Sequence, residues 1–136
     1  MSELEEKLAA KIVEREVRIK ETWGKLNAEA NGEVETINKA LAEKSALKLT
    51  ITLPNANEIS LGSNRGRVAR IALDWNSKNV ALSFNWLAGQ SYLFRIAEPE
   101  GHLRFAGGQQ YPGIPLDKAI STAEFVDRIT ADVVEL

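Results

Sequence analysis

The first third of the chain repeats apolar residues with the period of a helix. Between residues 2 and 44 they recur at steps of three, four or seven, a spacing that places them on one face of an α-helix. The members of this face are Leu4, Leu8, Ile12, Ile19, Trp23, Leu26, Ala30, Val34, Ile37 and Leu41. Glutamates four residues ahead of lysines or arginines support the same assignment. We therefore expect residues 2–44 to form a helical segment.

The length of this segment leaves two arrangements open. Forty-odd helical residues span roughly 60 Å, whereas a compact chain of this size is about 35 Å across. Asn31-Gly32 is the one plausible break, because both residues tolerate the left-handed conformation of a helix C-cap. One arrangement is a helical hairpin or a bent helix broken near Asn31-Gly32. The other is one long helix whose apolar face pairs with a second subunit.

A second, shorter apolar stripe favours the arrangement with a partner. Val13 and Val17 lie beside the main face, so the N-terminal half of the helix is apolar on more than one side. Such a helix is expected to touch two surfaces. We accordingly expect contact with a protein partner or a second copy through Val13, Val17, Ile19, Trp23 and Leu26.

Residues 46–106 alternate apolar and polar positions, as strands of a half-buried sheet do. Clusters of Pro, Asn, Asp, Ser and Gly separate the alternating runs and predict tight turns. The predicted turns are Pro54-Asn55-Ala56-Asn57, Asn76-Ser77-Lys78-Asn79 and Glu98-Pro99-Glu100-Gly101. The pattern predicts an antiparallel meander of five to six strands.

A last helix is expected over residues 117–134. Ser121-Thr122-Ala123-Glu124 has the pattern of a capping box. Phe125, Ile129 and Val133 follow at helical spacing and form its apolar stripe. Together these elements predict a single α+β domain over residues 1–136.

The lengths of the turns in the predicted meander indicate which residues face one another on neighbouring strands. Turn lengths place Trp75 opposite Val80, Trp86 opposite Tyr92, and Arg95 opposite Arg104. One face of the sheet then gathers the large apolar residues. The other face carries small residues, namely Ala72, Ala81, Ser83, Ala97 and Ala106. Because alanine is a poor strand former, such a face suits contact with a helix or another subunit, although a solvated face with incidental alanines is the alternative.

The facing arginines have two interpretations. Like charges at paired positions destabilise a sheet unless an opposite charge lies between them. In the structural interpretation, Asp74 or an acidic residue of a covering helix supplies that charge. In the functional interpretation, a small anionic ligand binds on this face. The ligand-binding residues would be Arg70, Ser83, Asn85, Arg95 and Arg104.

Composition narrows the function classes. The chain is 44% hydrophobic and 26% charged, values of an ordinary folded domain. A net charge of −2 gives no electrostatic argument for binding nucleic acid or an anionic membrane, and no apolar run has the length of a membrane helix. Cysteine is absent, which excludes disulfides, thiolate nucleophiles and cysteine-ligated metals. With no pattern of signal-peptide type at the charged start, a cytoplasmic location is expected.

The sequence contains none of the common catalytic motifs. The sequence contains no phosphate-binding loop, nucleophile elbow, zinc-binding HExxH or EF-hand loop. His102 is the only histidine and follows a predicted turn, where a surface position is expected; a general base acting with Asp74 is the alternative. We expect no cofactor and no metal. The sequence favours a small cytoplasmic interaction module of adaptor, chaperone-like or immunity type over a binder of an anionic ligand, and both over an enzyme.

Overall fold

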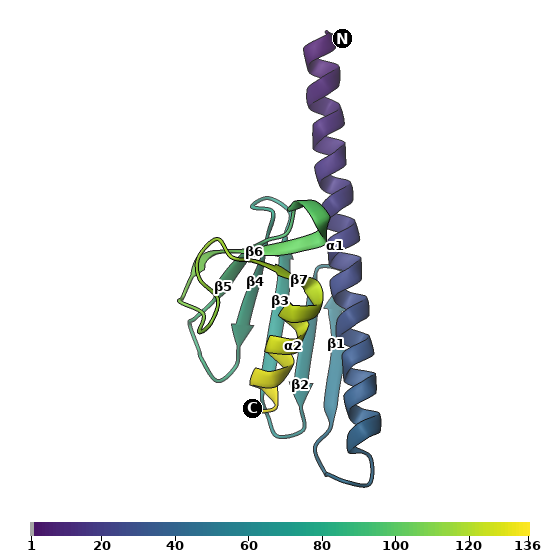
Figure 1. The fold of residues 1–136 in the computed structure, drawn as a ribbon, viewed down its shortest axis with the longest axis vertical. Coiled ribbons are helices and arrows are strands. Elements are labelled where there is room, and N and C mark those ends of the chain that lie inside the picture. The colour runs from purple at the N-terminus through teal and green to yellow at the C-terminus, as the bar shows by residue number, and fades with distance from the viewer. Residues whose placement is uncertain (1) are drawn as a thin grey trace.

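The computed structural model describes residues 2–136 and consists of a long helix, a seven-stranded sheet and a second helix (Figure 1). In chain order the elements are α1 (Glu3–Leu41), β1 (Leu49–Asn55), β2 (Glu58–Ser63), β3 (Val68–Asp74), β4 (Asn79–Phe84), β5 (Tyr92–Arg95), the 3-10 turn η1 (Pro99–Gly101), β6 (His102–Gly108), β7 (Ala119–Ser121) and α2 (Thr122–Val133). The strands lie in sequence order and every neighbouring pair is antiparallel. The predicted α+β meander is confirmed, with seven strands instead of five to six.

Helix α1 begins at a capping box and continues without a break. The Ser2 hydroxyl accepts a hydrogen bond from the Glu5 amide, and the Glu5 carboxylate accepts one from the Ser2 amide. Of the two arrangements left open, the structure has the one long helix and not the break near Asn31-Gly32. A glycine inside a helix costs about 1 kcal/mol, and burying Ala30 and Val34 on either side of it outweighs that cost.

The first four turns of α1 extend beyond the sheet, as Figure 1 shows. Residues 3–17 are all exposed, and burial begins at Ile19. We call residues 3–17 the projecting segment. Only the remainder of α1 packs on the domain, where it runs along β1 and α2.

The core lies between the two helices and one face of the sheet. Strands β3 and β4 alternate buried and more exposed residues along their length, which matches the predicted division into two faces. Phe94 at the centre has no exposed surface. Its ring centroid lies 5.1 Å from that of Phe105 and 4.9 Å from that of Phe125, so this one side chain joins two strands to α2.

The register of the β3–β4 hairpin differs from the prediction by two residues. Asp74 pairs with Asn79, in place of Trp75 with Val80. The cause is the Asp74 carboxylate, which accepts hydrogen bonds from the Asn76 amide (2.9 Å) and the Ser77 hydroxyl (3.0 Å). These bonds lower the pKa of Asp74 and begin the turn one residue early. An even shift leaves each residue on its predicted face.

The register of the β4–β5 hairpin differs from the prediction by four residues, and that of the β5–β6 hairpin agrees at Arg95. Tyr92 pairs with Leu82 and not with Trp86, because β4 ends at Phe84 and the chain turns there. Trp86 instead lies against the guanidinium of Arg67. The pairing of Arg95 with Arg104 is confirmed.

The C-terminal helix is shorter than expected. Ser121 is its N-cap and accepts a hydrogen bond from the Glu124 amide, as the capping pattern predicted. Residues 119–121 pair with β6 as strand β7, so the helix covers Thr122–Val133 in place of 117–134. A three-residue strand that runs directly into a helix cap gives no alternation of its own.

Within residues 2–136, no helix lies over the second face of the sheet. Both helices lie on the core face, and Arg70, Ala72 and Asp74 are exposed on the opposite side. The expectation that a helix of this chain covers the small residues is therefore wrong. We call this surface the open face; contact with another subunit there stays a prediction.

Candidate functional site

The projecting segment exposes five large apolar side chains. Leu4, Leu8 and Ile12 are 66%, 52% and 60% exposed, and they continue the face of α1 that is buried from Ile19 onward. Val13 and Val17, 58% and 45% exposed, form the second stripe on another side. Apolar exposure this concentrated typically marks a contact surface.

The predicted contact residues divide at Ile19. Val13 and Val17 are exposed, whereas Ile19 and Leu26 have no exposed surface and belong to the protein's own core. Trp23 is half-buried, and its indole nitrogen donates a hydrogen bond to the Ala56 carbonyl (3.0 Å). Ile19, Trp23 and Leu26 thus hold α1 on the domain, and the two fully buried residues, Ile19 and Leu26, are not available to a partner.

The predicted ligand-binding residues do not form one site. Arg70 lies opposite Ser83, with its Nε 2.6 Å from Oε1 of the buried Glu58. Asn85 has a structural role, because its side chain accepts a hydrogen bond from the Val68 amide at the start of β3 and donates one to the Gly66 carbonyl just before that strand. Arg95 lies on the next strand opposite Asn79, four residues or about 13 Å along the sheet from Ser83.

Arg104 is neutralised from within the chain. Its Nε lies 3.5 Å from Oε2 of Glu98, and its Nη1 donates a hydrogen bond to the Asp117 carbonyl (2.6 Å). The carboxylate near the arginine pair therefore comes from Glu98, and not from Asp74 or a covering helix. Arg95 itself is exposed.

Arg95 belongs to a cleft at the base of the projecting segment. The cleft has a volume of about 330 Å³ and is lined by Arg15 of α1, Lys78 of the β3–β4 turn, Arg95, and neighbouring residues that include Glu98. Within residues 2–136, none of Arg15, Lys78 and Arg95 takes part in a salt bridge. We call this the basic cleft. Its three cations come from elements far apart in sequence, so no sequence motif signals it.

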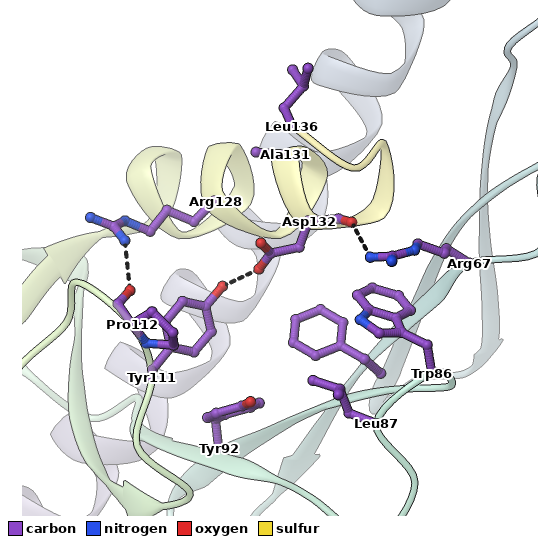
Figure 2. A pocket seen from close by; sticks show the side chains of 11 residues that line it. Arg67, Trp86, Leu87, Tyr92, Tyr111, Pro112, Arg128, Ala131, Asp132 and Leu136 are labelled. Atoms are coloured by element: carbon purple, nitrogen blue, oxygen red, sulfur yellow. Dashed lines mark hydrogen bonds between the residues drawn. The ribbon is translucent and has the colours of Figure 1, made fainter.

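A second cleft, of about 360 Å³, lies between the C-terminal end of α2 and the sheet (Figure 2). Its walls are aromatic: the ring of Phe84 lies 4.5 Å from that of Trp86, and Tyr92 lies 4.9 Å from Tyr111. The guanidinium of Arg67 lies over Trp86, 4.3 Å from the ring centroid. No sequence motif signals this contact, because Arg67 and Trp86 lie far apart in the chain.

The polar groups of this aromatic cleft bond to one another. The Tyr111 hydroxyl donates to Oδ2 of Asp132 (2.6 Å), and Arg67 donates to the Asp132 carbonyl (3.2 Å) (Figure 2). Burial, together with the Asp132 carboxylate, raises the pKa of Tyr111. Arg128 donates to the Pro112 carbonyl. These bonds fasten α2 to the loop between β6 and β7 and to the residue before β3, which is a structural task.

A third hollow, of about 470 Å³, lies between α1 and α2 and has mostly apolar walls. Two carboxyl groups meet there. Burial, then a hydrogen bond and charge repulsion from Asp127, raise the pKa of Glu33 to about 7. Because this value exceeds that of the unfolded chain, the stability gained from the bound proton is complete below about pH 4.5 and is lost as the pH rises through 7.

Replacing Glu33 by Gln should remove this loss. At about pH 8 we expect Glu33→Gln to raise the free energy of unfolding by about 1 kcal/mol, a value well below the full pKa shift because the half-buried side chain keeps some contact with water. At about pH 4 the variant should match the wild type. Urea unfolding at both pH values measures the difference.

The control for this prediction is Glu35→Gln on the same helix. Glu35 pairs with Lys39, which lowers the pKa of Glu35, so its loss should bring no gain at high pH. An equal response of both variants would contradict the role given to Glu33.

The described residues offer little other chemistry. His102 lies half-buried at the start of β6, three strands away from Asp74, so the two do not form an acid–base pair. Across residues 2–136, no three His, Asp or Glu side chains gather in a way that could hold a metal ion. Neither helix in that range is long and apolar enough to cross a membrane. No protein-family model, curated protein or solved structure matches this chain significantly.

Proposed function

We propose that this protein is a small cytoplasmic interaction module that binds another protein chain through its projecting segment. One observation carries the proposal: α1 extends about 22 Å beyond its own domain with five large apolar side chains exposed. An adaptor, a chaperone-like protein or an immunity-type protein would use such an element.

The projecting segment has little to stabilise it within a single chain. A helix of about 15 residues is marginally stable in water without tertiary contacts. The projecting segment is exposed along its whole length and is supported mainly by its continuity with the rest of α1. Burying one large apolar side chain contributes about 1.5–3 kcal/mol. A partner that covers Leu4, Leu8 and Ile12 would therefore stabilise the segment and gain most of its binding energy there.

The anionic-ligand alternative has weaker support. Arg70 is paired with Glu58 and Arg104 with Glu98. Of the three arginines predicted to bind the ligand, only Arg95 has no salt bridge within residues 2–136. An enzyme has weaker support again, since the aromatic cleft uses its polar groups for internal bonds.

Photo-crosslinking in living cells tests the proposal for any protein partner. A photoreactive residue at position 8 or 12 should give a product heavier than one chain, while one at the exposed positions Ala28 or Thr36, on the part of α1 that packs on the sheet, should give none. The two control positions lie on the same helix and differ only in being outside the projecting segment. A lack of product from both positions 8 and 12 would contradict the proposed function.

A further inference from the structure

We infer that the partner of the projecting segment is a second copy of this chain, packed antiparallel, with the acidic first turn of each copy in the basic cleft of the other. This inference rests on the proposed function and specifies its partner. Three properties support it: the shape of the molecule, the levels at which residues meet, and the charges at both ends of the contact.

The shapes of two antiparallel copies are complementary. Leu8 and Ile12 lie on the face of α1 that Ile19 turns toward the sheet, because spacings of four and seven return to the same side of a helix. The exposed stripe therefore overhangs the end of the domain, and the chain has the outline of a step (Figure 1). A second projecting segment, running the opposite way, has the length to lie along this stripe and end at the first domain.

Residue levels then bring opposite charges together. If Leu8 of one copy packs beside Ile12 of the other, residues at the same level have numbers that add to 20. Glu5 of each copy then lies level with Arg15 of the other. Arg15 also lines the basic cleft, so the stripe leads directly into it.

The charges at the two ends are complementary. The first turn of α1 carries Glu3, Glu5 and Glu6, of which Glu3 makes one exposed pair with Lys7 at 3.5 Å. In a parallel arrangement, by contrast, the glutamates of one copy would lie beside the same glutamates of the other copy, and their like charges would repel one another.

A stable interface requires both the apolar pairing of the helices and the insertion of the acidic turns into the basic clefts. The apolar pairing covers too few heptads to make a stable coiled coil alone, since three to four are usual. A specific interface normally buries about 1,200 Å² or more. Insertion of each acidic turn into the partner copy's domain adds two further contact regions to the helix pair, related by the twofold axis.

Charge reversal tests the arrangement on the full-length protein. The first variant is Glu5→Lys with Glu6→Lys; the second is Arg15→Glu with Arg95→Glu. Each alone should raise the dimer dissociation constant at least about tenfold, because like charges then meet at both ends. An equimolar mixture should recover the wild-type association, since each contact joins opposite charges again. Sedimentation velocity measures all three samples.

A matched control separates charge from helix capping. Glu5→Gln keeps a side chain that can complete the capping box but removes the charge, so we expect weaker association with unchanged helix content by circular dichroism. Recovery in the mixture also excludes misfolding of either reversed variant.

The outcomes separate this inference from the proposed function. A wild-type chain that stays monomeric, or a dimer that ignores both reversals, would overturn the antiparallel pairing. If the crosslinks from positions 8 and 12 then lead to a different protein, or to another surface of a second copy such as the open face, the proposed function stands and this inference fails.

Discussion

Replacing Phe94 by alanine is expected to lower the free energy of unfolding by about 3–5 kcal/mol. The side chain has no exposed surface and its ring contacts those of Phe105 and Phe125. The cavity left behind would weaken the packing of β5 against both β6 and α2. Urea unfolding followed by tryptophan fluorescence gives the difference.

The neighbouring Leu93 supplies the matched control. Leu93 lies on the open face and is half-buried, so Leu93→Ala should cost about 1 kcal/mol or less. Equal losses at Phe94 and Leu93 would mean that the assignment of core and open faces is wrong.

The faces of the sheet follow from the sequence, while the pairing of its strands follows only in part. Apolar alternation assigns Ile71, Leu73 and Leu82 to the core side, and each is buried. The register depends on where each turn begins, and at the β3–β4 hairpin a hydrogen bond that the Asp74 carboxylate accepts from the Asn76 amide decides it. Alternation cannot detect an even shift, because such a shift preserves both faces.

The course of α1 shows the limit of local signals. Asn31-Gly32 has the composition of a helix end, yet the helix continues because Ala30 and Val34 are both buried against the domain. The Asn31 side chain also bonds back to Asn27 within the helix. Tertiary packing outweighs the local preference, and no sequence window shows where that packing lies.

The sequence predicts that α1 carries an apolar contact surface, but it does not predict which residues of that surface are exposed. Helical spacing identifies one apolar face along all of α1, without indicating that Ile19 is the first buried member. That boundary is set by where the sheet and η1 end. The basic cleft could not be predicted at all, because Arg15, Lys78 and Arg95 meet only in three dimensions.

A double substitution in the projecting segment should abolish self-association and leave the fold intact. Leu8→Glu with Ile12→Glu places two charges in the centre of the proposed contact, where each lacks a partner. Together they should weaken the dimer at least about a hundredfold, since an unpaired buried charge and a lost apolar contact each cost more than about 1 kcal/mol. Both residues lie outside the core, so the free energy of unfolding of the monomer should change by less than about 1 kcal/mol.

Multi-angle light scattering of this variant, beside the wild type, tests the central claim most directly. Ala28→Glu with Thr36→Glu is the control, because it adds the same two charges to exposed positions of α1 over the domain. We predict the mass of two chains for the wild type and the control, and the mass of one folded chain for Leu8→Glu with Ile12→Glu. A dimer that survives in the last variant, or a wild type that is monomeric throughout, would contradict the claim that the projecting segment joins two copies.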